Sequence, residues 1–288
     1  MNILVTGCNG QLGSEMRVLS EEYPQHRFVF TDVAELDITD RSAVMLFVKD
    51  QAFDCIVNCA AYTNVDKAEE QEQTAYLINA TAVRNLAEAA TATGALLVHI
   101  STDYVFNGKA YIPYMETDPT DPQTAYGRTK LAGEELLLEA CERAIILRTA
   151  WLYSSFGNNF VKTMIRLGKE REQLGVVFDQ VGSPTYAADL ARAVMTVVTA
   201  PKEQLTNKIY HFTNEGVCSW YDFTKEIHRL AGIDNCNVRP IRSEEYQYKT
   251  ARPHYSVLDK GLFRRTFGVD IPHWQDGLRR CFELLNEN

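Results

Sequence analysis

The sequence predicts an α/β fold, in which a doubly wound, Rossmann-like parallel sheet is followed by a smaller C-terminal α/β lobe. Two observations indicate this class. Short apolar runs alternate with helical stretches through the first half of the chain, and a glycine-rich turn joins the first run to the first helix. Strict alternation of strand and helix implies parallel strands joined by right-handed crossovers, which place helices on both faces of the sheet.

The elements of the first half follow one another in a regular order. Apolar runs predict strands at residues 2–6, 27–31, 55–59, 95–101 and 144–149. Helices are expected between them at residues 11–22, 41–51, 71–93 and 126–141. A polar loop containing several prolines separates the fourth strand from the last of these helices. We therefore expect residues 1–150 to form a dinucleotide-binding domain.

The regular alternation loosens after about Trp151. Helices are expected at residues 160–171, 187–199, 220–231 and 274–285, and short strands at 175–179 and 208–212. No repeat or flexible linker separates this part from the first. We expect residues 151–288 to form mainly a substrate lobe packed on the first domain, with the chain returning to that domain from parts of 185–215.

The composition excludes several classes of protein. The 288 residues carry a formal net charge of −9, which disfavours a nucleic-acid binder. Seven cysteines without a CxxC pair indicate neither a disulfide framework nor a zinc site, and no metal is expected. No segment approaches the ~18 consecutive apolar residues of a membrane span, and the first residues do not form a basic leader. We expect a cytoplasmic protein.

The segment TGCNGQLG lies between the first strand and the first helix and has glycines at positions 7, 10 and 13. The first glycine allows a tight turn, the second lets the backbone approach a pyrophosphate, and the third lets the helix pack closely on the sheet. The spacing is GxxGxxG rather than GxGxxG, but its position between a strand and a helix favours dinucleotide binding. The residues expected to contact the cofactor here are Gly7, Asn9, Gly10, Gln11, Leu12 and Gly13.

Further cofactor contacts are expected at the ends of the second and third strands. Asp32 closes the second strand about 20 residues past the turn, where an acid bonds ribose hydroxyls and usually favours NADH. A structural role as a helix-capping or loop aspartate is the alternative. The other residues expected along the cofactor are Asp37 and Ile38 beside the adenine, and Ala60, Ala61 and Tyr62 after the third strand.

Tyr126 and Lys130 form the predicted catalytic pair. They are one helical turn apart in YGRTK, so they share a face of the helix, and the lysine is expected to lower the pKa of the phenol and to hold the nicotinamide ribose. Thr102 follows the fourth strand at the ligand-binding edge of the sheet, where its hydroxyl can orient a carbonyl. Tyr221 and Lys225 repeat the same spacing without such a threonine upstream, so that second copy is interpreted as a surface helix pair.

Together these motifs resemble the extended short-chain dehydrogenase/reductases. More narrowly, the chain is similar to the dTDP-4-dehydrorhamnose reductase family over roughly residues 1–190, and ARP at 251–253 also fits. The segments that carry the resemblance are TGCNGQLG, NCAAYTNVDKAE, ISTDYVFNG, YGRTKLAGE, RTAWLYS, GNNFVKTM and DQVGSPT.

The resemblance implies an activity and a set of roles. The activity is reduction of the C4 ketone of dTDP-4-dehydro-6-deoxy-L-mannose to dTDP-L-rhamnose, with NADPH or NADH. Thr102 and Asp103 are implied to contact the sugar, and Tyr126 to donate the proton. Trp151 is implied to line the substrate pocket, with core packing as the alternative. Arg252 is expected to meet the diphosphate, with a surface salt bridge as the alternative.

Related functions remain as alternatives. Nucleotide-sugar dehydratases resemble this framework but carry an Asp-Glu pair after the threonine, whereas Asp103-Tyr104 follows Thr102 here. A related 4-ketoreductase or epimerase, and a non-catalytic NADP-binding subunit of a methionine adenosyltransferase, are the other candidates. The protein is expected to be a monomer or a homodimer. A magnesium-bridged dimer is disfavoured because Glu15 can supply one ligand while Ala188 stands where another is expected.

Overall fold

A six-stranded parallel sheet forms the centre of the protein in the computed structural model, which describes residues 1–205 and 208–287. The strand order is β10-β5-β4-β3-β1-β2, and every pairing in this sheet is parallel. The strands are β1 (Asn2–Thr6), β2 (Arg27–Thr31), β3 (Cys55–Asn58), β4 (Leu96–Thr102), β5 (Ala144–Thr149) and β10 (Ile209–His211). The predicted doubly wound α/β fold is confirmed.

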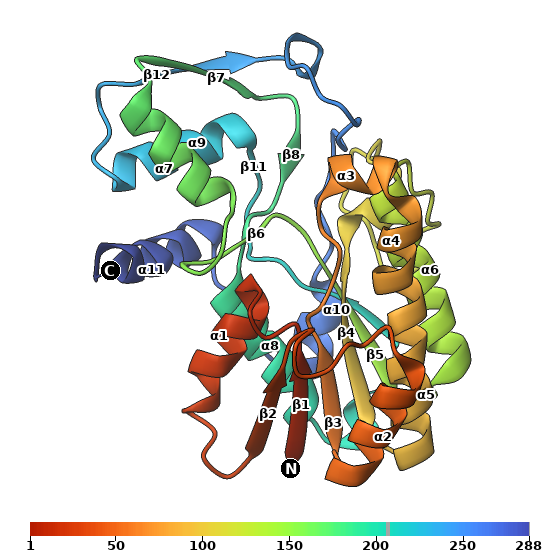
Figure 1. Ribbon diagram of the computed structural model, residues 1–288. Helices are drawn as coiled ribbons and strands as arrows, with labels where there is room; N and C mark the ends of the chain where they lie inside the picture. Colours follow the sequence, from red (N-terminus) through yellow and green to blue (C-terminus); the bar gives the residue numbers. More distant parts are fainter. Residues whose placement is uncertain (206–207, 288) are drawn as a thin grey trace.

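Helices cover both faces of this sheet (Figure 1). One face packs against α1 (Gln11–Ser20), α8 (Ala187–Thr199) and α10 (Gly261–Phe267), and the other against α2 (Arg41–Gln51), α5 (Ala82–Thr93) and α6 (Ala125–Ala140). Successive strand residues alternate between the two cores, as β1 illustrates. Ile3 and Val5 belong to the α1 side and Leu4 to the α2 side, because side chains of a strand point to opposite faces. Burial on both faces explains why the strands are apolar throughout.

The helix predicted at 71–93 is confirmed as helical backbone over 72–93, but it is not a single α-helix. It consists of α4 (Glu72–Tyr76), a π-helical segment (Leu77–Thr81) and α5, and a short helix that was not predicted, α3 (Val65–Glu70), precedes it. The wider π turn presents Asn79, whose amide donates to the Tyr62 carbonyl and the Thr129 hydroxyl, while its Oδ1 accepts from the Tyr62 N–H. The helix therefore departs from α geometry where its side chain ties a loop to α6, as π turns often do near functional sites.

The smaller lobe consists of three helices and three two-stranded pairings in the described residues. The helices are α7 (Phe160–Glu170), α9 (Trp220–Leu230) and α11 (Trp274–Glu287). The paired strands are β7 (Gln173–Val177) with β12 (Asn237–Ile241), β8 (Val181–Gly182) with β11 (Cys218–Ser219), and β6 (Leu152–Tyr153) with β9 (Thr185–Tyr186). The strand expected at 175–179 lies two residues earlier, as β7. The five other strands of the lobe were not predicted because each is very short or interrupted by polar residues.

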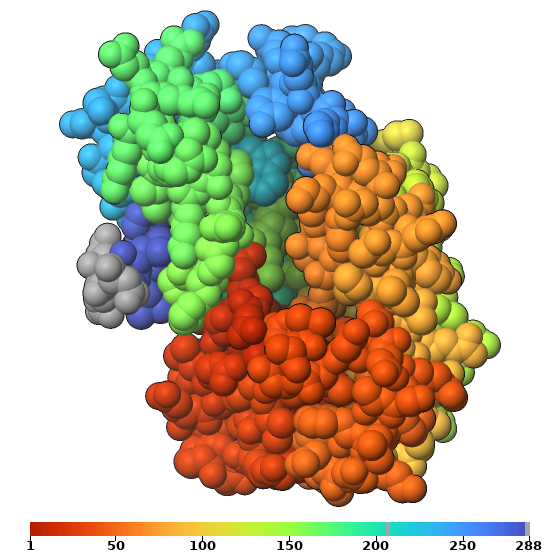
Figure 2. All heavy atoms as spheres, in the orientation of Figure 1, coloured from red at the N-terminus to blue at the C-terminus, as the bar shows by residue number. Residues whose placement is uncertain are grey.

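The chain returns from this lobe to the sheet. α8 packs against α1, and β10 pairs with β5 at the sheet edge, so both elements lie with the first 150 residues. We propose on this basis a sheet domain of 1–150 plus this return and α10, which packs on the same sheet, and a lobe formed by the rest of 151–288. In the space-filling view a recess separates the segment around residues 150–170 from the segment around 60–80 (Figure 2).

Three further features bear on the predicted class of protein. All seven cysteines are free thiols. Among residues 1–205 and 208–287, no helix combines the length and the apolar character needed to cross a membrane. Within the same ranges, no three His, Cys, Asp or Glu side chains are grouped as a metal site.

Candidate active site

A cavity of about 470 Å³ lies at the carboxyl ends of the central strands, where parallel sheets bind ligands. The glycine turn forms one end of it, and the predicted catalytic residues form the other. The predicted site residues that line this cavity are Gly10, Gln11, Leu12, Ala61, Thr102, Asp103, Tyr126, Lys130 and Trp151. Residues from separate stretches of sequence therefore converge on one space.

The glycine turn leaves the first turn of α1 open toward this cavity. Gly7 has φ +65°, and a Cβ there would lie 2.6 Å from Ala60 Cα, so only glycine fits. α1 begins after Gly10, and this end of the helix has neither a side-chain cap nor an acid in its first turn. Its backbone N–H groups are therefore available, and together with the positive end of the helix dipole they suit a pyrophosphate. The turn thus fits a dinucleotide.

Asp32 holds the glycine turn from the neighbouring strand. Its carboxylate accepts the N–H of Asn9 at 3.0 Å and the N–H of Val33 at 2.9 Å. Each oxygen keeps a further lone pair with which to accept a ribose hydroxyl. The loop role expected as the alternative is therefore present, and it leaves the cofactor role open to the same carboxylate.

The remaining predicted cofactor residues lie outside the cavity lining. Asp37 is exposed and accepts the N–H and the hydroxyl of Thr39, and Ile38 packs in the core on the α2 side. Ala60 lies directly behind Gly7, and the Tyr62 hydroxyl donates to Gln71. The structure thus brings the glycine turn and the catalytic residues together but leaves these four beside or beneath the site.

Tyr126 lies in the first turn of α6, whose position is set by Thr124. The Thr124 hydroxyl caps the helix by accepting the N–H of Gly127 at 3.0 Å. Burial raises the pKa of Tyr126 to about 12, although the Thr102 hydroxyl beside the phenol acts in the opposite direction. The expected lowering of this pKa by Lys130 is therefore wrong for the free protein. A phenol with a raised pKa stays protonated at neutral pH, which is the form that a proton donor requires.

Lys130 is turned toward the sheet, which explains why it does not lower the pKa of Tyr126. Its Nζ donates to the Ile100 carbonyl at 2.7 Å and lies 3.2 Å from His99 Nε2. The residue is only 1% exposed, and burial lowers its pKa to about 8, while the carboxylate of Glu134 raises it. The amine therefore lies at the cavity but is held by groups beneath it.

Thr102 and Asp103 form a hydrogen-bonded pair at the end of β4. The Thr102 hydroxyl donates to Asp103 Oδ1 at 2.9 Å and accepts the N–H of Tyr104 at 3.2 Å. Burial raises the pKa of Asp103 to about 6, against the effect of the hydroxyls of Ser256 and Thr102. In the absence of ligand, the carboxylate thereby orients the threonine hydroxyl next to Tyr126.

A buried ion pair beneath the site was not predicted. Arg148 on β5 contacts the Glu134 carboxylate through Nε at 3.0 Å and Nη2 at 2.6 Å, and the Ser101 hydroxyl donates to the same carboxylate. Glu134 is one helical turn beyond Lys130, and Arg148 stands in the otherwise apolar run AIILRT. A charged residue inside a buried strand was the signal available in the sequence, because such a charge requires a partner.

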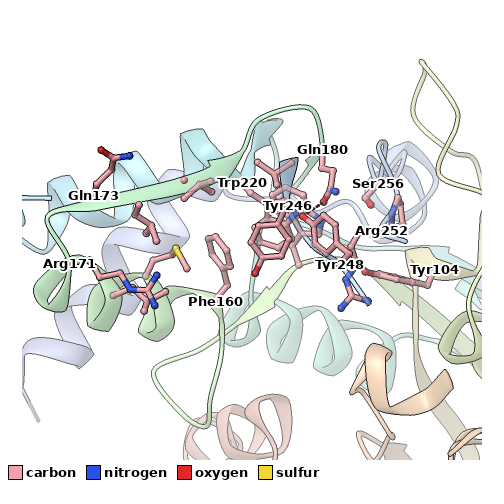
Figure 3. A pocket seen from close by; sticks show the side chains of 18 residues that line it. Tyr104, Phe160, Arg171, Gln173, Gln180, Trp220, Tyr246, Tyr248, Arg252 and Ser256 are labelled. Carbon is pink, nitrogen blue, oxygen red and sulfur yellow. Dashed lines mark hydrogen bonds between the residues drawn. The ribbon is translucent and has the colours of Figure 1, made fainter. Parts of the chain in front are cut away.

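A second cavity of about 590 Å³ lies in the smaller lobe and shares Tyr104 and Trp151 with the first. Phe160, Trp220, Tyr246 and Tyr248 supply aromatic walls, and Gln180 and Arg252 add polar groups (Figure 3). An apolar cavity with a few convergent polar groups is typical of a site for an organic ligand. Sequence reasoning missed this aromatic lining because its members are scattered over different segments.

Trp151 lines both cavities, and Arg252 lines the second. Trp151 adopts φ +50°, and its ring stacks on Trp220 with centroids 3.4 Å apart. A non-glycine residue in this region of backbone space is uncommon, so its surroundings impose the conformation. Arg252 pairs with Asp66 of α3 at 2.9 Å, and its guanidinium lies over the Tyr248 ring. The salt bridge expected as the alternative for Arg252 is thus formed, at a residue that also lines the second cavity.

The second YxxxK copy lies outside both cavities. Tyr221 and Lys225 are on α9 of the smaller lobe, Lys225 is exposed, and neither lines either cavity. The first copy, in contrast, combines a phenol, a lysine and a threonine hydroxyl around one space that also reaches an open helix N-terminus. This fold and this site define an NAD(P)H-dependent reductase of the extended short-chain type.

Comparison with known proteins narrows the class to a family. The family model described as the RmlD substrate binding domain matches residues 1–287. The dTDP-4-dehydrorhamnose reductase of Escherichia coli (strain K12) is 41% identical over 301 residues, which cover 100% of this chain and 98% of that protein. The chain belongs to the RmlD substrate binding domain family, and the resemblance seen in the sequence is confirmed.

Solved structures agree with this assignment. A dTDP-4-dehydrorhamnose reductase from Clostridium acetobutylicum superposes with a TM-score of 0.94 at 46% identity, over 99% of this chain and 100% of that one. A dTDP-4-dehydrorhamnose reductase from Bacillus anthracis, solved in complex with NADP, has a TM-score of 0.92 at 42% identity, over 98% of this chain and 99% of that one. Fold and family therefore extend over the whole described chain.

Proposed function

We propose that the protein reduces the C4 ketone of dTDP-4-dehydro-6-deoxy-L-mannose, with NADPH or NADH, to form dTDP-L-rhamnose. The observation that carries this proposal is the convergence of Thr102, Tyr126 and Lys130 at one end of a cavity whose other end is the open N-terminus of α1. The names of the relatives from three organisms support the choice of substrate. The free thiols fit a reducing cytoplasm, which is the location we propose.

The two cavities divide the ligands between them in this proposal. The dinucleotide lies along the glycine turn and reaches Lys130, and the sugar lies between Thr102, Tyr126 and Trp151. The nucleotide part of the substrate then enters the aromatic cavity, and its diphosphate meets Arg252 in exchange for part of the contact with Asp66.

The chemistry follows from the side chains around the ketone. When bound, the reduced dinucleotide supplies a hydride to the carbonyl carbon. Tyr126, protonated at neutral pH, donates its proton to the carbonyl oxygen as negative charge develops there. Thr102 turns its hydroxyl from Asp103 to the same oxygen and orients the ketone. One hydride and one proton are added, which converts the ketone to an alcohol and leaves Tyr126 as a phenolate that is reprotonated before the next turnover.

Oxidation of NADPH or NADH, followed at the nicotinamide absorbance with the 4-keto sugar nucleotide, tests the proposal. The wild type is expected to oxidise the coenzyme, Tyr126→Phe to lose most of the rate, and Tyr221→Phe to retain it. Tyr221→Phe is the matched control because it removes the same hydroxyl from the second YxxxK copy. Nucleotide binding without turnover in the wild type would favour the non-catalytic regulatory alternative. Undiminished turnover by Tyr126→Phe would refute the assigned proton donor.

A further inference from the structure

A row of buried, hydrogen-bonded side chains crosses the sheet near the carboxyl ends of its central strands and ends at Lys130. The Thr6 hydroxyl donates to Asn58 Oδ1 at 2.7 Å, and Asn58 Nδ2 lies 3.0 Å from His99 Nδ1. His99 Nε2 in turn lies 3.2 Å from Lys130 Nζ. Thr6, Asn58 and His99 stand on the neighbouring strands β1, β3 and β4, and all are buried. The function proposed above uses only the last member of this row.

The orientation of the Asn58 amide is settled by its neighbours. The N–H of Ala60 is a backbone donor and lies 3.1 Å from Asn58 Oδ1, so the atom facing it must be an oxygen. The atom facing His99 is therefore the amide nitrogen, which can only donate. His99 Nδ1 must accept, so it carries no proton.

This contact determines the tautomer of His99. Burial and the nearby Lys130 hold the pKa of His99 well below its ordinary value, so the imidazole is neutral and has one N–H. Because Nδ1 accepts from Asn58, that proton is on Nε2, which faces Lys130. An ammonium group has three donors and no acceptor, so it cannot accept this N–H, whereas a neutral amine can.

We propose that His99 is a positioning residue for Lys130: its Nε2–H, oriented by Asn58, hydrogen-bonds the neutral amine of Lys130 in the nucleotide-free site and disfavours the ammonium form. Binding of a dinucleotide then draws a proton from solution onto Lys130, because the ammonium offers the anionic ligand three donors and a positive charge. This inference rests on the proposed function in that it requires Lys130 to contact the dinucleotide.

Burial is the main cause of the lowered pKa of Lys130, and the proposed contact with His99 acts in the same direction. The titratable and charged groups near this end of the cavity are Tyr126 and Glu134 on α6, His99 on β4, Asp103 and Tyr104 after β4, Cys59 after β3, and Arg148 on β5. Glu134 favours the ammonium, but Arg148 binds its carboxylate at 2.6 Å and balances its charge. Burial raises the pKa of Cys59 to about 12 and that of Tyr126 to about 12, so both are neutral.

Three substitutions separate the tautomer from other effects. Asn58→Asp keeps an oxygen toward Thr6 and Ala60 but presents an acceptor to His99, so the imidazole proton moves to Nδ1 and the Nε2 lone pair faces Lys130. His99→Leu removes the ring. His99→Gln retains an N–H donor at the end of the side chain. Circular dichroism and thermal unfolding establish that each variant is folded.

Proton uptake on nucleotide binding is the measurement, because a purely structural role would not change it. Calorimetric titration with NADPH, in two buffers of different ionisation enthalpy between about pH 7 and 9.5, counts the protons taken up. We expect the wild type and His99→Gln to take up a proton fraction that is largest above about pH 8. Asn58→Asp and His99→Leu should shift the onset upward by about one pH unit, a tenfold change in proton affinity.

A double variant excludes the negative charge that Asn58→Asp introduces as the cause of the shift. If the tautomer acts, Asn58→Asp shifts the onset in the wild type and has little further effect in the His99→Leu background. Equal shifts in both backgrounds, or unchanged proton uptake in both single variants, would overturn the proposal. If His99→Leu does not fold, the Asn58→Asp variant alone tests the proposal. Proton uptake whose onset is unshifted in Asn58→Asp would then overturn it. Proton-coupled NADPH binding without sugar reduction would refute the proposed function alone, while a wild type that binds no dinucleotide would refute both.

Discussion

The ion pair between Glu134 and Arg148 offers a sharp test of how the site is supported. The two side chains are 2% and 3% exposed, and Arg148 contacts the carboxylate through Nε and Nη2. Glu134→Gln keeps the size and one acceptor oxygen but places an N–H₂ group against a guanidinium donor. Removing one partner of a buried pair leaves the other charge uncompensated, which costs about 3–5 kcal/mol. We take about 3 kcal/mol, because the glutamine can still accept one bond.

The chain provides a matched control on its surface. Arg192 contacts Glu22 through Nη1 at 2.8 Å and Nη2 at 2.7 Å, so this pair is also bidentate, but both side chains are 54% exposed. Water solvates the arginine when the carboxylate is lost, so Glu22→Gln should cost at most about 1 kcal/mol. The two substitutions are chemically identical and differ in burial.

Differential scanning calorimetry at neutral pH measures the difference. One kcal/mol corresponds to about 2–4 °C in Tm for domains of about this size, so Glu134→Gln should lower Tm by about 6–12 °C. Glu22→Gln should lower it by no more than about 4 °C. Equal decreases for the two variants would refute the reasoning, because burial would then not determine the strength of the pair.

Three further predictions concern the reacting groups. Tyr126→Phe should lower kcat/KM for ketone reduction about 10²–10⁴-fold while the Kd for NADPH, from a fluorescence titration, stays within about twofold; a large change in Kd would contradict the assigned role. If Asp103 contacts the sugar as proposed, its ionised carboxylate accepts sugar hydroxyls more strongly than the neutral acid does. Because burial raises the pKa of Asp103 to about 6, kcat/KM should rise as pH increases through 6, and an Asp103→Asn enzyme that keeps this rise would exclude Asp103 as its source. Lys130 has a pKa of about 8 when folded and about 10.4 when unfolded, so between these values the unfolded state binds more protons and stability increases with pH. Lys130→Met should therefore have a higher Tm than the wild type at about pH 7. Calorimetry should show that this difference in Tm becomes smaller toward about pH 10.

Local patterns predicted much of the site. The glycine turn and the Tyr126–Lys130 pair are short-range features, since a strand–turn–helix and an i, i+4 spacing place their residues wherever the rest of the chain goes. Thr102 was found because the end of a parallel strand always lies at the ligand edge. The electrostatics were not predictable in this way. The pKa of Tyr126 rises rather than falls, because distant parts of the chain bury the phenol and the amine of Lys130 is turned toward the sheet.

Alternating apolar strands and helices were enough to predict the doubly wound class, because they allow few other arrangements. Local patterns also supplied the residues that we propose for the chemistry of reduction. The surroundings of these residues depend on the folded chain: Asn58 and His99 meet across neighbouring strands, and Glu134 and Arg148 meet between a helix and a strand. The fold likewise assembled the aromatic cavity. Such contacts depend on strand order, register and helix packing, which bring together residues far apart in the chain and which no local pattern encodes.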